Sequence, residues 1–183
     1  MSTTQALAKM TPEMTRLTIR TDRLLLRPAT WDDLTALHEI FTDPVAMRYW
    51  DRPPNTELAQ TEAFLSSFMR GDTEMRLEYI LDLDGVCIGK AGMWKRPEIG
   101  YILHPRHWRK GYAFEALSAI LPRIWSRFPE EPCLTAELDP RNVGSAKLLE
   151  KLGFHLVRVE EKNFLYGEDE WCDTAYYQMP PPE

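Results

Sequence analysis

The sequence predicts a mixed α/β fold built around a single β-sheet. Strand-like segments, rich in β-branched and aromatic residues or with alternating apolar positions, are interleaved with segments whose apolar residues recur every three or four positions. The resulting order is β-α-α-β-β-β-α-β-α-β-β. The 183 residues fit one domain, which we place at residues 17–179, with a mobile arm at residues 1–16 and a tail at residues 180–183.

The first part of the domain is predicted to form an interrupted strand and two helices. The strand covers residues 17–19 and 24–27. The first helix begins at Thr30, where Asp33 is placed to close a capping box, and it ends at Asp43-Pro44. A second amphipathic helix covers residues 56–71, with Gly71 as its final residue.

A hairpin follows these helices. Residues 77–83 and 86–94 flank Asp84-Gly85, which is the strongest hairpin signal in the chain. Gly89 and Gly92 leave the second strand without side chains at two positions, which indicates a bulge or a close neighbour.

The last part of the domain is predicted to alternate strands and helices. The strands are expected at residues 98–103, 134–138, 155–159 and 171–179, and the helices after Gly111 and after Asn142. Pro122 lies inside the first of these helices and is expected to kink or weaken it. Gly153 supplies a left-handed cap to the second helix, and Phe154 the apolar contact that often follows such a cap.

Composition excludes several classes of protein. The net charge of −6 argues against general nucleic-acid binding, and no apolar run approaches membrane-spanning length. Three scattered cysteines predict free thiols in a reducing compartment, and the N-terminus lacks a signal-peptide core, so we expect a cytoplasmic protein. The four histidines lack metal-ligand spacing to a cysteine or to one another, apart from His104 and His107 on one turn, and no bound metal is expected.

The turn between the strand at residues 98–103 and the following helix is a candidate anion site. Residues 95–110 contain five Lys or Arg and one acid, Glu98, in a chain that is acidic overall. The first turn of a helix presents amide N–H groups without internal partners, and the helix dipole favours negative charge there. Gly111 and Ala113 leave room for a phosphate to reach those amides. The alternative is an ordinary strand-to-helix connection with a solvated basic surface.

Several short motifs, in order and over residues 17–179, together resemble the GNAT superfamily of N-acetyltransferases, and within it the branch of ribosomal-protein N-terminal acetyltransferases. The motifs are Arg23-Leu-Leu-Leu-Arg27-Pro28, Asp43-Pro44-Val45-Ala-Met47-Arg48-Tyr49, Glu98-Ile99-Gly100-Tyr101, Trp108-Arg-Lys-Gly111-Tyr112-Ala113-x-Glu115-Ala116-Leu117, Asn142-x-x-Ser145, Glu150-Lys151-Leu152-Gly153-Phe154, and Glu170-Trp171-x-Asp173 followed by Tyr176.

The resemblance implies a GNAT-type fold with splayed central strands and acetyl-coenzyme A as the cofactor. It implies that amides around Arg109–Phe114 hold the pyrophosphate and that the strand before them pairs with the pantetheine arm. Asn142 and Ser145 would contact the cofactor near its thiol end. The implied cofactor-binding residues are Tyr101, Ile102, Leu103, Trp108, Arg109, Lys110, Gly111, Tyr112, Ala113, Phe114, Asn142 and Ser145.

The resemblance also suggests catalytic candidates. Glu98 is our candidate general base, with a solvated strand-end carboxylate as the alternative and with Glu78 and Glu137 as weaker candidates. Many family members carry a tyrosine general acid at the position of Leu149, so Ser145 is the substitute candidate. Ser145 and Asn142 also fit plain roles in the first turn and the cap of a helix.

The reaction implied by the resemblance is acetyl transfer to a primary amine by direct attack. The alternative is a module that binds an acyl-coenzyme A without catalysing transfer, because the family tyrosine is absent. Tyr49, Trp50 and Phe68 are candidates for the acceptor site, with core packing as the alternative. Protein N-termini, amino acids, polyamines and antibiotic amines all remain open as acceptors, the net charge favours a cationic one, and both a monomer and a homodimer remain open.

Overall fold

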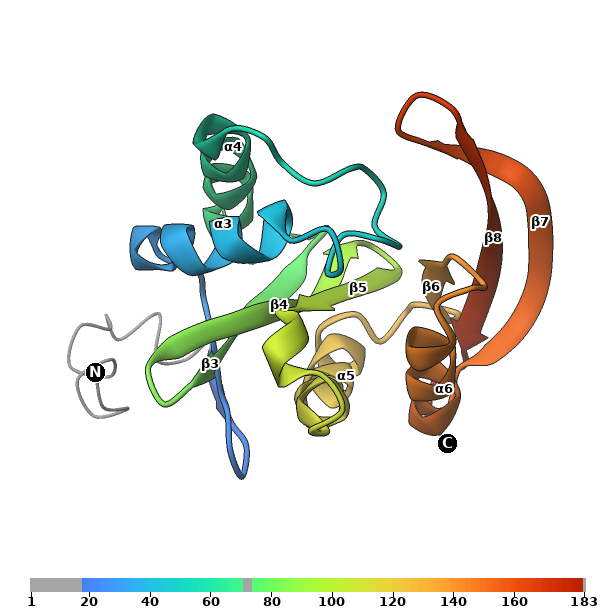
Figure 1. Ribbon diagram of the computed structural model, residues 1–183. Helices are drawn as coiled ribbons and strands as arrows, with labels where there is room; N and C mark the ends of the chain where they lie inside the picture. The colour runs from blue at the N-terminus through green and yellow to red at the C-terminus, as the bar shows by residue number, and fades with distance from the viewer. Residues whose placement is uncertain (1–17, 71–73, 183) are drawn as a thin grey trace.

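The computed structural model describes residues 18–70 and 74–182, which form one eight-stranded sheet with helices on both faces (Figure 1). The strand order is β1-β2-β3-β4-β5-β6-β8-β7, so the predicted mixed α/β fold is confirmed. The strands are β1 (Ile19–Arg20), β2 (Leu25–Arg27), β3 (Leu77–Leu83), β4 (Val86–Lys95), β5 (Glu98–Leu103), β6 (Leu134–Leu138), β7 (His155–Tyr166) and β8 (Glu170–Met179). Our predictions of an N-terminal arm and of a helix end at Gly71 concern residues outside the described part.

Two pairs of helices cover the sheet on opposite faces (Figure 1). Helices α3 (Leu34–Thr42) and α4 (Leu58–Met69) lie on one face, and α5 (Tyr112–Arg127) and α6 (Val143–Leu152) on the other. Each pair buries its own apolar cluster. The first contains Leu37, Phe41 and Leu65, and the second contains Leu117 and Ile120. Burial of such side chains is the main source of stability in a domain of this size.

Local signals in the sequence explain several elements. Asp33 accepts the main-chain N–H of Thr30 at 2.8 Å, as the predicted capping box requires, although the first turn is a 3₁₀ helix, η1 (Trp31–Asp33). The β3–β4 hairpin turns at Asp84-Gly85 as predicted, with both residues at positive φ. Gly153 caps α6 at φ 99°, and the Phe154 N–H donates to the Leu149 carbonyl at 3.0 Å.

The predicted close neighbours of Gly89 and Gly92 are present. A Cβ at Gly89 would lie 2.2 Å from the carbonyl oxygen of Ile102, and one at Gly92 would lie 2.3 Å from that of Leu77. The register of β3 against β4 also shifts between Leu81 and Asp82, next to Gly89. Both glycines therefore allow adjacent strands to approach closely in the middle of the sheet.

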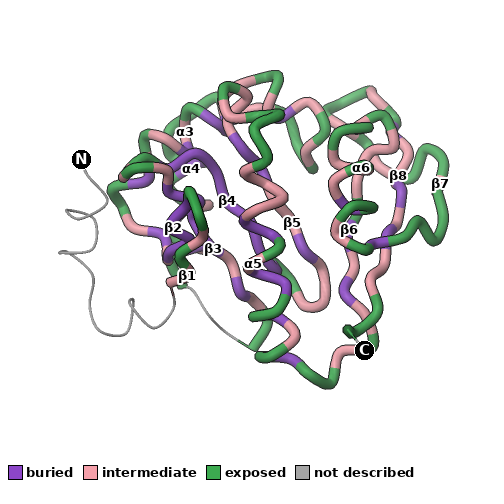
Figure 2. Tube along the Cα trace, turned by 90° about the horizontal axis from the view of Figure 1, so that it is seen from below, coloured by how far each residue is buried: buried purple, intermediate pink, exposed green. Residues whose placement is uncertain are grey.

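Helix α5 runs continuously from Tyr112 to Arg127 with Pro122 inside it, and the expected kink or weakening at the proline stays a prediction. One prediction about an element needs correction. Strand β7 extends from His155 to Tyr166 instead of ending at Val159, because it pairs with β8 as far as Tyr166–Glu170. Figure 2 shows β7 as a mostly exposed strand at the edge of the sheet.

The sheet is split in its middle. Strands β5 and β6 run parallel, and their register consists of one pair, Glu98 with Thr135, supported by a 3.1 Å bond from the Thr135 N–H to the Pro97 carbonyl. Beyond that pair the two strands are not joined by a ladder. The splayed central strands expected from the sequence are therefore present, and they position the functional site.

Candidate active site

A cleft of about 630 Å³ opens where β5 and β6 part. Ile99, Gly100 and Tyr101 line it from β5, and Ala136 and Leu138 line it from β6. The start of α6, the segment between α3 and α4, and the β7–β8 hairpin complete its walls. Both halves of the sheet therefore contribute residues to the cleft, at the point where the hydrogen bonding between them is interrupted.

The main chain of Tyr101 faces the gap between the strands. The His104 N–H donates to the Ile88 carbonyl of β4 at 3.0 Å, and inter-strand bonding alternates along an antiparallel strand. Ile102 consequently faces β4, whereas Tyr101 and Leu103 face away from it. The Leu103 carbonyl already accepts the indole N–H of Trp108 at 2.8 Å. Of the three predicted strand residues, Tyr101 is therefore the one whose main-chain N–H and carbonyl both face the gap without a partner in the described chain.

The basic turn after β5 matches the geometry of an anion cradle. It contains the 3₁₀ helix η2 (Pro105–His107) and ends at Gly111, the N-cap of α5, with φ 82°. Residues 108–111 are exposed, and within the described chain no hydrogen-bond partner is found for the amides of residues 109–114. Burial, followed by the charge of Lys110, lowers the pKa of His107. Positive charge on the turn therefore comes from its arginine and lysine side chains.

The turn between β1 and β2 is tied to the first turn of α5. The Glu115 carboxylate accepts the Thr21 hydroxyl at 2.6 Å, the Arg23 N–H at 2.8 Å and the Arg23 Nε–H at 2.6 Å. Arg23 Nη1 also donates to the Lys110 carbonyl at 2.9 Å, and its guanidinium lies over the Tyr112 ring at 4.4 Å. We call this network the Arg23 clamp. It neutralises the negative charge of Glu115 beside the candidate anion cradle.

Glu98 lies at the fork of the split sheet, because it forms the last pair between β5 and β6. Burial raises the pKa of its carboxyl above the usual value, and the nearby Glu137 and Asp51 raise it further. A hydrogen bond from Trp94 and the charge of Lys95 act in the opposite direction. A cleft carboxylate with a raised pKa is suited to accept a proton near neutral pH.

The start of α6 brings the other catalytic candidates to the same cleft. Asn142 is the N-cap of α6, and its side chain accepts the Ser145 N–H at 3.2 Å. Ser145 and Leu149 line the cleft one turn apart. The Tyr101 hydroxyl reaches the Ser145 carbonyl at 3.4 Å, and burial raises the pKa of this phenol to about 12.

The wall opposite α6 combines aromatic side chains with a buried ion pair. Tyr49, Trp50 and Phe68, the predicted acceptor residues, all line the cleft, although Phe68 also belongs to the core under α3 and α4. Lys90 lies beside Trp50 and Phe68, and its Nζ is 2.5 Å from Glu78 Oε1. From the sequence, Glu78 is only a weaker candidate for the base, and Lys90 is not a candidate.

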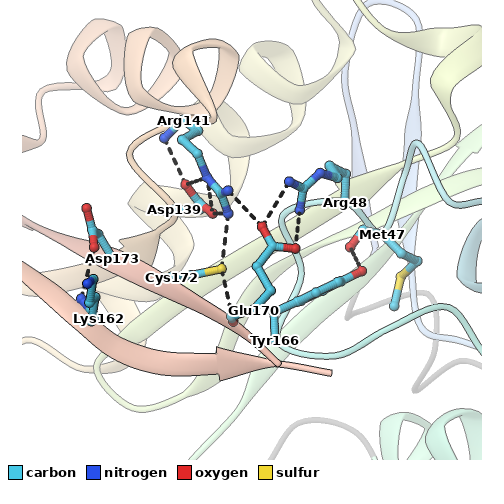
Figure 3. Close-up of polar contacts among 9 residues, drawn as sticks. All are labelled: Met47, Arg48, Asp139, Arg141, Lys162, Tyr166, Glu170, Cys172 and Asp173. Atoms are coloured by element: carbon cyan, nitrogen blue, oxygen red, sulfur yellow. Dashed lines mark hydrogen bonds and ion pairs between the residues drawn. The ribbon is translucent and has the colours of Figure 1, made fainter. Parts of the chain in front are cut away.

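A polar network links the far walls of the cleft, and Figure 3 shows Glu170 between two guanidinium groups. Glu170 Oε1 lies 3.0 Å from Arg48 Nη2 and 2.8 Å from Arg141 Nη1, and Arg141 also pairs with Asp139. The Tyr166 hydroxyl donates to the Met47 carbonyl at 3.0 Å. We call these contacts the Glu170 latch. They join the segment between α3 and α4 to the β7–β8 hairpin.

The predicted site residues therefore fall into three groups. The cleft is lined by Glu98, Tyr101, Asn142, Ser145, Tyr49, Trp50 and Phe68. Ile102 and Leu103 do not line it and are buried in β5, and Trp108–Phe114 form the neighbouring turn and the start of α5. The Arg23 clamp and the Glu170 latch escaped sequence analysis as functional contacts, although Arg23, Glu115, Arg48 and Glu170 all lie inside motifs that carried the family resemblance.

This arrangement, with an open strand edge, an anion cradle and a cleft between parted strands, is that of an acyltransferase that uses a nucleotide-linked thioester. The family model for the acetyltransferase (GNAT) domain matches residues 23–155. The uncharacterized N-acetyltransferase YnaD of Bacillus subtilis is 30% identical over 166 residues, covering 88% of this chain and 95% of the relative. The chain therefore belongs to the GNAT acetyltransferase family and is an acetyl-coenzyme A-dependent N-acetyltransferase.

Two solved structures share the fold at low identity. One is an acetyltransferase from Salmonella typhimurium that modifies the N-terminal serine of ribosomal protein L7/L12, with a TM-score of 0.75 at 16% identity over 88% of this chain and 97% of that one. The other is the spermidine N-acetyltransferase from Vibrio cholerae in complex with coenzyme A and spermine, with a TM-score of 0.71 at 17% identity over 86% and 95%.

Three further observations limit the chemistry of the described residues. Cys87, Cys133 and Cys172 are free, and burial raises the pKa of Cys87 to about 12. Among residues 18–70 and 74–182 there is no cluster of three or more His, Cys, Asp or Glu side chains that could hold a metal ion. In the same part of the chain, no helix has both the length and the apolar character needed to cross a membrane.

Proposed function

We propose that the protein transfers the acetyl group of acetyl-coenzyme A to a primary amine by direct attack in a ternary complex. The acceptor is the amine of a protein N-terminus or of a small molecule. The observation that supports this most is the parting of β5 and β6 beyond Glu98 and Thr135, because it leaves a free strand edge inside a cleft.

Different residues of the chain would bind different parts of the cofactor. The amides of residues 109–114, of which residues 109–111 are exposed, suit the pyrophosphate, because an anion at a helix N-terminus gains several N–H bonds and the helix dipole. The free peptide edge of Tyr101 suits the pantetheine amides, and Asn142 and Ser145, which line the same cleft, would contact the thiol end. When bound, acetyl-coenzyme A supplies the activated acetyl thioester.

Positioning is the largest contribution that this site offers. Holding two reactants together can supply roughly 7–11 kcal/mol, and an amide N–H aimed at a developing oxyanion about 3–4 kcal/mol. A general base or acid adds about 10²–10⁴ in rate. The absence of a tyrosine at Leu149 is therefore compatible with activity.

Glu98 would remove the proton from the acceptor amine, directly or through water, and Ser145 would donate one near the thiol end. An α-amine with an unperturbed pKa near ~8 is partly neutral at pH 7, whereas a lysine amine near ~10.4 is almost wholly charged. The requirement for Glu98 is accordingly smaller for a terminal amine.

Substitution of Gly111 tests the cofactor site. Gly111→Trp adds a large side chain at the N-cap of α5, at a residue with φ 82°, and we expect it to abolish measurable binding of coenzyme A in calorimetry. Ser118→Trp is the matched control, since Ser118 is exposed on the same helix. Equal coenzyme A affinity in both variants and the wild type would contradict the proposed cradle.

A thiol-release assay on a panel of primary amines then tests the reaction. We expect turnover on at least one amine that depends on both acetyl-coenzyme A and Glu98. Tight coenzyme A binding without turnover on any amine would instead identify an acyl-coenzyme A-binding module, the alternative that the absent tyrosine raises.

A further inference from the structure

The lining of the cleft contains a buried ion pair with unused hydrogen-bonding capacity. The Lys90 side chain is 4% exposed and that of Glu78 is 6% exposed, and both line the cleft. An ammonium group has three N–H donors and a carboxylate two oxygens. Within the described chain each group has one hydrogen-bond partner, which is the other. Two N–H donors and one carboxylate oxygen therefore remain.

Aromatic rings surround the ammonium group. Lys90 Nζ lies 5.7 Å from the centre of the Trp50 ring, 5.2 Å from that of Phe64 and 5.8 Å from that of Phe68. Taking two charges out of water is costly, and their mutual attraction offsets this cost only when further hydrogen bonds complete the pair. A cleft-lining pair that the protein itself leaves with spare donors and a spare acceptor is suited to a ligand that supplies both a donor and an acceptor.

We propose that the Lys90–Glu78 pair binds a peptide group of the acceptor and thereby selects peptide or protein N-termini over simple amines. A peptide group has one carbonyl oxygen, which accepts from Lys90, and one N–H, which donates to the free oxygen of Glu78. An alkylamine or polyamine lacks the carbonyl. This proposal rests on the proposed acetyl transfer and assigns the class of acceptor to its cleft.

The sheet geometry places the pair at a suitable distance from Glu98. Glu78 is the register partner of Gly92, which is the partner of Gly100, so the three lie on one face of the sheet. Glu98 shares that face, two residues before Gly100. Two strand spacings of about 4.8 Å separate Glu78 from β5, which is the reach of about three extended residues. The two glycines add no side chain of their own along that path, but the Trp94 ring lies over this face at Gly100, 3.2 Å from where a Cβ of Gly100 would be, so a bound peptide would pass beside Trp94.

The double variant Lys90→Met/Glu78→Gln tests the proposal. It removes both charges together, so no single buried charge is left without a partner. Thiol release is measured with three acceptors: a short peptide with a free N-terminus and an amidated C-terminus, hexylamine, and spermidine. Each result is expressed as the ratio of variant to wild-type kcat/KM, so that differences between the acceptors in the fraction of neutral amine cancel.

We expect the peptide ratio to fall roughly 10- to 100-fold, the loss typical of hydrogen bonds to charged groups, while the hexylamine ratio changes less than about twofold. Lys147→Met is the matched control, because Lys147 is an exposed lysine of α6 that does not line the cleft. It should leave the peptide ratio near one. Calorimetry with coenzyme A confirms that the double variant is folded and loads its cofactor.

Three outcomes would overturn the proposal. Equal losses for peptide and hexylamine would show that the pair supports the cleft without selecting the acceptor. Preference for spermidine, with a loss confined to spermidine in the double variant, would show that Glu78 recognises a cation. A wild-type protein that binds coenzyme A and acetylates none of the three acceptors would count against the proposed function itself. The proposed acceptor site would then be rejected as well.

Discussion

Glu98, the proposed general base, has a carboxyl group whose ionised form is disfavoured by burial in the folded protein. Burial raises the pKa of its carboxyl, which means that the folded protein favours the protonated form more than the unfolded chain does. The sign of the linkage follows from this. Stability associated with Glu98 is highest below its unfolded-state pKa and is lost as pH rises through the raised pKa of the folded state. At neutral pH the ionised carboxylate therefore opposes folding.

Replacing Glu98 with Gln should consequently separate stability from activity. We expect Tm at pH 7 to rise slightly, because the desolvation of a charge is relieved, and kcat/KM to fall about 10²- to 10⁴-fold if Glu98 is the base. In the wild type the rate should decline as pH falls through a pKa above that of an ordinary glutamate, and this limb should be absent in the variant. The decline that belongs to the acceptor amine itself should remain in both.

The alternative of a solvated strand-end carboxylate predicts a different result. Glu98→Gln would then change neither Tm nor the pH profile, and activity would stay within about twofold. Glu161→Gln is a suitable control, because Glu161 is an exposed carboxylate that does not line the cleft. Differential scanning fluorimetry and a pH series of thiol release provide both measurements on the same samples.

At the residue scale, the sequence predicted features that local chemistry determines. Gly153 and Asp84-Gly85 were correctly placed because a left-handed cap and a two-residue turn have strong residue preferences. The role of Lys90 could not be predicted in this way. A lysine within a strand pattern gives no sign that Glu78 and three aromatic rings, brought by other elements, will surround it.

At the element scale, the continuity of α5 at Pro122 and the length of β7 have physical explanations. Pro122 lies on the exposed side of α5, and Ser118, whose carbonyl loses its helical partner there, is also exposed, so water can satisfy that carbonyl. Strand β7 continues past Val159 through four polar residues, Glu160 to Asn163, because its pairing with β8 resumes at Phe164. Both of its faces are largely exposed, so its sequence shows no alternation of apolar and polar residues that would predict a strand.

The Arg23 clamp leads to a prediction about a connection between two elements. Arg23→Ala would leave the Glu115 carboxylate uncovered in the first turn of α5, beside the proposed pyrophosphate site. We expect the KM for acetyl-coenzyme A to rise about tenfold, through loss of a cation and exposure of an anion, with kcat within about twofold. Steady-state kinetics with varied acetyl-coenzyme A measures both constants.

Two further variants identify the cause of any effect of Arg23. Arg20→Ala removes an exposed arginine of the same hairpin and should leave KM unchanged. Adding Glu115→Gln to Arg23→Ala should restore part of the affinity, because the uncovered charge is then gone. A lower Tm with an unchanged KM would show that the clamp supports the fold alone.

At the scale of the whole molecule, the split between β5 and β6 requires other connections between the two halves. The Glu170 latch is one of these, since Arg48 and Glu170 are 122 positions apart in the sequence and join opposite walls of the cleft (Figure 3). Motif order was enough to predict the splayed strands through the family resemblance. The latch was not predicted, because no local pattern relates two residues at such a separation.

Breaking the latch should affect the acceptor more than the cofactor. Arg141 and Arg48 lower the pKa of Glu170, so the carboxylate stays ionised and the latch intact throughout the pH range of an activity assay. Exposed ion pairs contribute about 0–1 kcal/mol, so Glu170→Gln should change Tm little. It should nevertheless loosen the segment at residues 43–57, which lines the cleft through Arg48 to Arg52. We therefore expect the KM for the amine to rise several-fold while coenzyme A affinity is unchanged.

Glu160→Gln is the control for this prediction. Glu160 pairs with Arg158 and accepts the Tyr176 hydroxyl at 3.0 Å, so its contacts remain inside the β7–β8 hairpin and do not cross the cleft. Hydrogen exchange at residues 43–57 should increase in Glu170→Gln and not in Glu160→Gln. If both variants raise the KM for the amine equally, the hairpin matters as a wall of the cleft and the latch has no separate role. If only Glu170→Gln does so, the two halves of the split sheet are held in register for the acceptor by contacts that lie outside the sheet.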